Sequence, residues 1–165
     1  PNWSSPVNTP ADADRTARRL LSHDRVDALL VTQQITSDLL EPVVLAAHEF
    51  GRPVVGQVWA TDGAQAARLG IDQLDNTSRI FYSREYPAER LLAYRTVAER
   101  LALLGRGWAA IDWDLTQIII DAMVEHDVAH CPTLVVTQAQ AQTITAELAA
   151  DLDYQTEFGA AEHQT

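Results

Sequence analysis

Short apolar runs alternate along the chain with stretches in which apolar side chains recur at helical spacing. Leu40, Val43, Val44 and Ala47 form one such helical stripe. The four apolar runs, each short enough to be a buried strand, are residues 26–31, 53–59, 71–74 and 129–136. Apolar strands separated by helices are typical of parallel sheets with crossover helices. The pattern therefore predicts an α/β fold with about four parallel strands in chain order.

Helix starts and stops divide the chain between these runs. Thr9 and Pro10 provide a capping hydroxyl and a proline at the first helical position, and Gly70 closes a short helix that begins near Asp62. Further helices are expected at residues 37–50, 87–104, 114–126 (capped by Asp114) and 138–152. The expected organisation is a flexible arm at 1–9, one α/β domain at 10–152 and a polar tail at 153–165.

Composition restricts the kinds of partner. The chain has 23 acidic and 12 basic residues, all of the latter arginine, and a net charge of −11. Such a balance disfavours nucleic acid and anionic membranes as partners. The sequence has neither a helix-length apolar run nor a signal-peptide pattern, and a single cysteine, Cys131, allows no disulfide framework within the chain. We expect a cytoplasmic protein.

The central region resembles a known family. Ala47-His48 and Gly51-Arg52-Pro53-Val54 match a segment that ends the fifth strand of metal-dependent amidohydrolase barrels of the imidazolonepropionase and prolidase-like kind. A second pattern of these barrels, leading to their sixth strand, is matched by Ala64, Ala67, Gly70, Ile71, Asp72, Leu74 and Thr77, and a later one by 120–124 and 132–134. The resemblance covers roughly residues 26–136 and implies a partial, half TIM-barrel-like sheet with flanking helices.

The departures from this pattern concern the metal ligands. Gln57 and Asn76 stand where the family has two metal-binding histidines, and Leu30 stands where it has the metal-bridging lysine. An amide is a poor metal ligand and leucine is none. The ligands of the family's first and eighth strands have no counterpart. The resemblance therefore implies an amidohydrolase architecture with neither a metal site nor any other cofactor.

Several side chains are expected at the carboxyl ends of the strands, where parallel α/β folds bind ligands. Asp75 and His130 are the candidates for proton transfer. Gln57 and Asn76 would hold a ligand by hydrogen bonds or would simply replace the missing histidines, and Asp75 could instead be a carboxylate oriented by a neighbouring backbone group or by Arg79. The predicted substrate-binding set is Gln57, Asn76, Trp59, Gln33 and Thr133; Trp59 is expected to share the face of Gln57.

Three functions remain open at this point. One is a metal-independent enzyme for isomerisation, cyclisation, dehydration or hydrolysis of a mostly apolar small molecule. Another is a non-catalytic module that binds a small molecule in the same pocket. The third is a fragment whose missing strands come from another chain. A half-barrel leaves sheet edges and an apolar face uncovered, which predicts a homodimer with contacts at the sheet edge or around Ile118, Ile119 and Met123.

Overall fold

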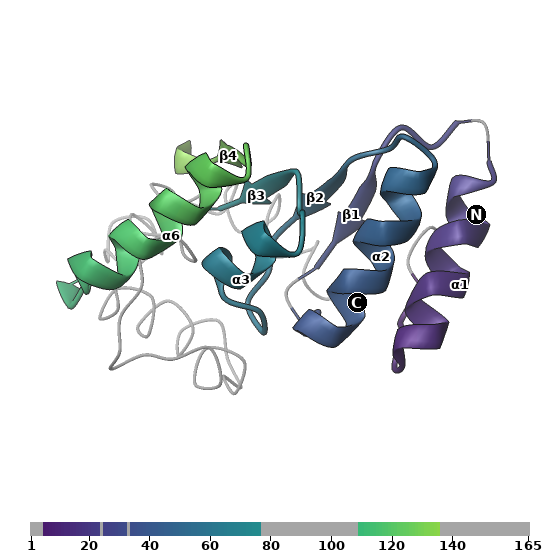
Figure 1. Ribbon diagram of the computed structural model, residues 1–165, viewed down its shortest axis with the longest axis horizontal. Helices are drawn as coiled ribbons and strands as arrows, with labels where there is room; N and C mark the ends of the chain where they lie inside the picture. Colours follow the sequence, from purple (N-terminus) through teal and green to yellow (C-terminus); the bar gives the residue numbers. More distant parts are fainter. Residues whose placement is uncertain (1–4, 24, 33, 77–108, 136–165) are drawn as a thin grey trace, which may run out of the picture.

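A computed structural model describes residues 5–23, 25–32, 34–76 and 109–135. The elements are α1 (Pro10–Leu21), β1 (Leu29–Val31), α2 (Ser37–Glu49), β2 (Val54–Gly56), α3 (Gly63–Arg68), β3 (Gln73–Asp75), α6 (Trp113–Glu125) and β4 (Ala129–Cys131). They follow one another along the sheet in chain order, from α1 at one end to α6 and β4 at the other (Figure 1).

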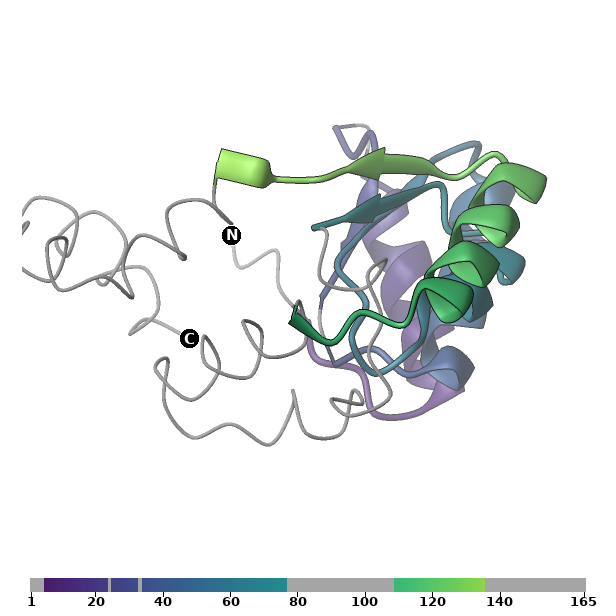
Figure 2. The same ribbon diagram turned by 90° about the vertical axis from the view of Figure 1, so that its left-hand side faces the viewer.

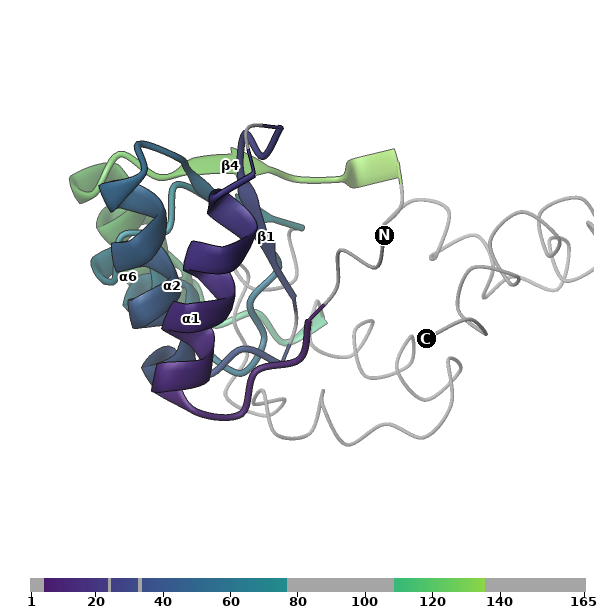
Figure 3. The same ribbon diagram turned by 90° about the vertical axis from the view of Figure 1, so that its right-hand side faces the viewer.

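The sheet has four strands, all parallel, in the order β1-β2-β3-β4. This confirms the predicted α/β fold with four parallel strands in chain order, an arrangement consistent with part of a TIM-like barrel. The four helices α1, α2, α3 and α6 lie on the same side of the sheet (Figures 2 and 3). None of these four helices covers the opposite side, which we call the open face.

Side-chain alternation assigns the strand residues to these two faces. Leu29, Val31, Val54 and Leu74 point towards the helices and are at most 7% exposed. The register places Leu30, Val55, Gln73 and Asp75 on the open face, where Leu30 is 67% exposed. The core therefore forms between the sheet and the helices. Its buried helical residues include Ala13, Ala17, Leu40, Val44, Ala47, Ala66, Ala67, Ile119 and Met123.

The helices begin at capping side chains. Thr9 accepts a hydrogen bond from the Asp12 amide (3.2 Å), and Asp62 accepts one from the Gln65 amide (2.8 Å). Each bond satisfies an amide that the first helical turn leaves without a partner. The cap of α6 is Asp112, whose carboxylate accepts from the Leu115 amide, and not Asp114 as predicted. Asp114 lies within the first turn instead.

The strands are shorter than predicted. Apolar residues such as Val26 and Val58 flank the three-residue ladders without joining them. The expected fourth strand ends at Cys131, because Leu134 and Val135 are helical. The expected helices at 87–104 and 138–152, residues 1–4 of the arm and the whole tail lie outside the described residues. Within the described part of the arm, Val7 packs against the core and Arg19 donates to the Ser5 hydroxyl (3.0 Å).

An ion network and a shared carboxylate fasten the helices to one another and to the sheet. Arg18 of α1 donates to Glu49 of α2 (2.6 Å) and to Asp14 (2.8 Å). The hydrogen bond that Glu49 accepts from Arg18, together with the positive charge of Arg18, holds the pKa of Glu49 below its usual value. At the amino ends of the strands, Asp72 Oδ2 accepts from the Val54 amide (2.7 Å) and lies 3.0 Å from His48 Nε2.

Candidate functional site

The carboxyl ends of the four strands meet at one edge of the sheet because the strands are parallel. Val31, Gly56, Asp75 and Cys131 are the last residues of the four strands. Gln57 and Asn76 follow directly, and Thr133 lies two residues beyond β4. The topology thus brings these predicted residues to one edge, while Gln33 lies outside the described residues.

Gln57 is positioned by a close contact between β1 and β2. The backbone N–H of Gln57 donates to the Val31 carbonyl (3.2 Å). At the preceding residue, Gly56, a Cβ atom would lie 2.1 Å from the same carbonyl oxygen. Only glycine fits this approach, and the tight pairing of the two strand ends fixes where the half-buried Gln57 leaves the sheet.

Asn76 directly follows β3 and has a left-handed backbone conformation, with φ of 70°. The backbone N–H of Asn76 donates to the Cys131 carbonyl (2.8 Å), so Asn76 still pairs with β4 while the chain turns away. Asparagine adopts positive φ more readily than most residues. The backbone conformation alone therefore explains why an asparagine stands at this position instead of a histidine, whether or not its side chain binds a ligand. Thr133, with φ of 46°, is a less favourable residue for that conformation.

Asp75 is half-buried on the open face and has a fixed orientation. The Gln73 side-chain amide, two residues earlier on the same face, donates to Asp75 Oδ1 (2.7 Å). The orienting group expected from sequence was a backbone amide or Arg79; residue 79 lies outside the described residues. Sequence reasoning missed Gln73, although period-two spacing along a strand was the signal that identifies it.

His130 begins on the other face of the sheet. It pairs with Leu74, a helix-facing residue, whereas Asp75 pairs with Cys131. Partial desolvation lowers the pKa of the exposed His130, while a hydrogen bond with the Asn76 backbone and the charge of Asp75 oppose this shift. The charge of Asp75 therefore acts on His130. The register nevertheless starts the two side chains on opposite faces of the sheet, so they do not point together towards one substrate.

Trp59 lies in the connection between β2 and α3 and is 0% exposed. The expectation that it shares the face of Gln57 assumed a strand continuing to residue 59, but β2 ends at Gly56. Alternation therefore does not relate Trp59 to Gln57. Nearby, the buried Thr61 hydroxyl donates to the Ile35 carbonyl (2.9 Å) and ties this connection to the one that follows β1.

The three positions that the sequence resemblance relates to metal ligands carry no strong metal donor. Gln57 and Asn76 offer neutral amides, and Leu30 offers no donor. Among the described residues, no group of three or more histidine, cysteine, aspartate or glutamate side chains is placed to hold a metal ion. The side chains of Leu30, Gln57 and Asn76 therefore do not supply the imidazole, thiolate or carboxylate groups that zinc prefers.

The fold and this edge together define a class: consecutive parallel strand–helix units whose polar residues gather at the strand carboxyl ends. No protein-family model matches the chain, and no curated protein matches it. None of the helices in the described ranges is long and apolar enough to span a membrane.

Proposed function

We propose that the chain is an amidohydrolase-like half-barrel that binds a mostly apolar small molecule at the strand carboxyl ends and transfers protons to it without a metal. The observation that carries the proposal is the Asp75 carboxylate, half-buried on the open face and oriented by Gln73 at 2.7 Å. A fixed carboxylate at this edge suits general acid–base chemistry. The reaction class is isomerisation, cyclisation, dehydration or hydrolysis.

The neighbouring groups have separate roles in this proposal. Gln73 donates to Oδ1 of Asp75, which leaves Oδ2 as the oxygen that exchanges a proton with the substrate. The side-chain amides of Gln57 and Asn76 orient a carbonyl or hydroxyl group of the ligand. His130, whose lowered pKa favours the neutral ring near pH 7, supports the Asn76 turn or acts as a second proton carrier at the rim.

Turnover in the presence of a chelator tests this proposal. We would incubate the full chain, purified with EDTA, with a panel of neutral lactones, lactams and hydroxyketones and follow the products by proton NMR. We expect turnover that persists in EDTA and is lost in Asp75→Asn. Gln73→Glu, which keeps the length of the side chain but replaces the amide donor with a repelling carboxylate, should also lose most of it. Turnover that is unchanged in Asp75→Asn would refute the role of Asp75.

The alternative is a non-catalytic binding module, and one observation favours it. Asp75 and His130 start on opposite faces of the sheet, so the edge supplies one well-directed proton carrier instead of two. A binder would show ligand-dependent shifts of the Asp75 and Asn76 amide resonances with no conversion of any compound. If no compound of the panel causes either turnover or shifts at this edge, both forms of the proposal are wrong.

Assembly and location complete the proposal, which includes a cytoplasmic homodimer. Of the α6 residues predicted for the contact, Ile118 is 49% exposed, whereas Ile119 and Met123 are 4% and 7% exposed and belong to the core. Trp113, Ile120 and Val124 form the exposed apolar stripe of α6 and are 66%, 37% and 77% exposed. We place the dimer contact there. Light scattering that gives the mass of one 18.2 kDa chain would contradict it.

A further inference from the structure

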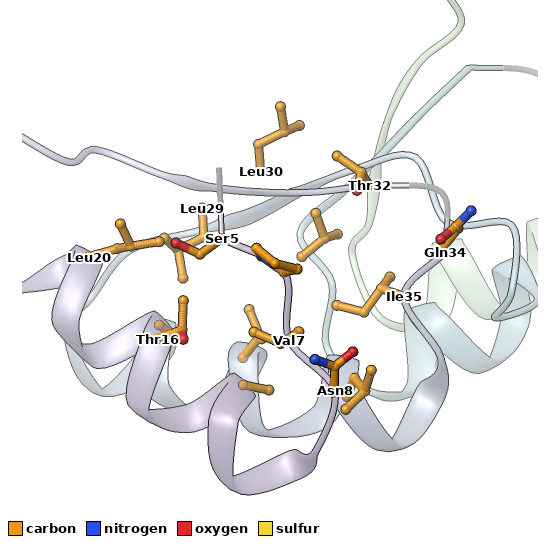
Figure 4. A pocket seen from close by; sticks show the side chains of 16 residues that line it. Ser5, Val7, Asn8, Thr16, Leu20, Leu29, Leu30, Thr32, Gln34 and Ile35 are labelled. Carbon is orange, nitrogen blue, oxygen red and sulfur yellow. The ribbon is translucent and has the colours of Figure 1, made fainter. Parts of the chain in front are cut away.

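A cavity of about 580 Å³ lies at the β1 end of the sheet, away from Asp75. Its walls come from the segment before α1, from α1 itself, from β1 and the connection after it, and from the start of α2 (Figure 4). The volume falls in the range of roughly 300–1,000 Å³ that is usual for small-molecule sites. None of Gln57, Trp59, Asp75, Asn76, His130 or Thr133 lines it.

Among the residues that the structure describes, the lining carries no charged side chain. All sixteen lining residues are apolar or neutral polar, in a chain with 23 acidic and 12 basic residues. The apolar surface comes from side chains such as Val7, Leu20 and Ile35, and the polar groups are hydroxyls and amides such as those of Thr16 and Asn8. A charged ligand would lose hydration here without finding an opposite charge. The cavity therefore selects a neutral molecule.

The main chain of β1 adds hydrogen-bonding groups to this wall. Leu29 and Val31 direct their backbone groups to β2, as the bonds from Leu29 N to the Pro53 carbonyl and from Gln57 N to the Val31 carbonyl show. The N–H and C=O of Leu30 point to the outer edge, where no described strand pairs with β1. Figure 4 shows the Leu30 side chain on the other side of the strand from Leu29, so Leu30 contributes its main chain to the cavity.

The Ser5 hydroxyl is a second fixed polar group at the cavity. Arg19, which does not line the cavity, donates to its oxygen at 3.0 Å. Because this oxygen already accepts a charged donor, the Ser5 hydroxyl hydrogen is directed away and remains the group to donate to a ligand. The cavity thus combines an apolar body with a donor at Ser5 and a donor–acceptor pair at Leu30.

We propose that this cavity is a second binding site, distinct from the group formed by Gln57, Asp75 and Asn76, for a neutral and mostly apolar molecule that carries a primary amide. The carbonyl of a primary amide and the N–H on the same side point in one direction and match the two backbone groups of Leu30, and the apolar part fills the space between Val7, Leu20 and Ile35. This site binds its ligand without contact to Asp75, so its occupancy is independent of chemistry at the strand ends.

Three probes of similar size and different polarity test the proposed ligand class. They are the primary amide 4-butylbenzamide, its ester analogue methyl 4-butylbenzoate, and the anion 4-pentylbenzoate, titrated into the full chain by amide NMR. The benzamide should shift the amide resonances of residues 5, 7, 8, 16–20, 29–32, 34 and 35, and leave those of 73–76 in place. The ester, which lacks the N–H donor, should bind about threefold to tenfold more weakly, and the anion should not bind at these residues. If the benzamide shifts none of these resonances, or if the anion binds equally well, the proposal is wrong.

Matched variants locate the site. Thr16→Trp fills the cavity and should abolish benzamide binding, whereas Arg15→Trp adds the same ring to the exposed side of α1 and should not affect it. Val7→Asp should weaken binding about tenfold or more and the uncharged isostere Val7→Asn much less, which keeps the test valid if the larger substitution disturbs folding. Circular dichroism confirms the fold of each variant. Unchanged affinity in folded Thr16→Trp and Val7→Asp would place the benzamide elsewhere and overturn the proposal, whatever the outcome at Asp75.

Discussion

Gly56→Ala should destabilise the fold strongly, because it introduces a methyl group where β1 and β2 are in closest contact. The added Cβ would lie 2.1 Å from the Val31 carbonyl oxygen and 2.9 Å from both its carbonyl carbon and Cγ2. Ordinary contacts begin near 3.4 Å. The two strand ends would have to separate by more than about 1 Å, and the nearest obstacle is backbone, which cannot rotate away.

The expected magnitude follows from two terms. Forcing extra volume into a packed region costs about 1–3 kcal/mol. Separation of the strands also stretches the hydrogen bond from Gln57 N to the Val31 carbonyl, already 3.2 Å, whose loss costs about 1 kcal/mol. The sum, about 2–4 kcal/mol, is a large part of the roughly 5–15 kcal/mol that stabilises a typical domain.

Gly51 provides a matched control for this substitution. Gly51 has a positive φ of 64°, as Gly56 has one of 156°, but a Cβ atom at Gly51 would have nothing within 4 Å. Gly51→Ala should therefore cost only the conformational strain, about 1–2 kcal/mol. Urea unfolding followed by circular dichroism measures both changes as shifts of the transition midpoint. If Gly56→Ala loses no more stability than Gly51→Ala, the close approach of the strands does not determine the packing at this edge.

Two further predictions concern the charged side chains that fasten helices and strands. Asp72→Asn should cost about 1–2 kcal/mol in urea unfolding, because the neutral amide oxygen accepts more weakly from Val54 and His48; an unchanged midpoint would show that the shared carboxylate is not needed. The pKa of Glu49 is lowered by Arg18, so the ion pair stabilises the fold fully above pH about 4.5, and this contribution is lost as the pH falls through the lowered pKa. Thermal unfolding curves of wild type and Glu49→Gln should therefore differ at neutral pH and converge in acid, and a constant difference from pH 7 to acid would refute this.

The order and type of the elements were predictable from sequence because their signals are local. Capping by Thr9 and Asp62 and the termination at Gly70 depend on residues within one turn of the helix ends, and the structure confirms each. The ends of the strands were not predictable. Val58 and Trp59 are as apolar as the strand before them, but they are buried by tertiary contacts after the ladder has ended.

The sequence was enough to predict which residues lie at the strand-end edge, but not how their side chains are directed. Parallel strands bring Gln57, Asp75 and Asn76 to one edge whatever their register. Whether Asp75 and His130 share a face depends on the pairing of β3 with β4, which joins residues more than fifty positions apart and leaves no periodic signal. The neutral cavity likewise depends on how α1 packs beside β1, which no local pattern encodes.

The sheet order has a consequence for how the protein folds. Among the described strands, each pairs with its neighbours in the sequence and with no other, and the closest helix packing joins α1 with α2 and α3 with α6. The unit from α1 to β2 can therefore form before β4 has left the ribosome, and each later unit adds to an edge that already exists. We expect the chain to acquire structure progressively from its amino-terminal side during synthesis, with β4 as the last strand to be protected from hydrogen exchange.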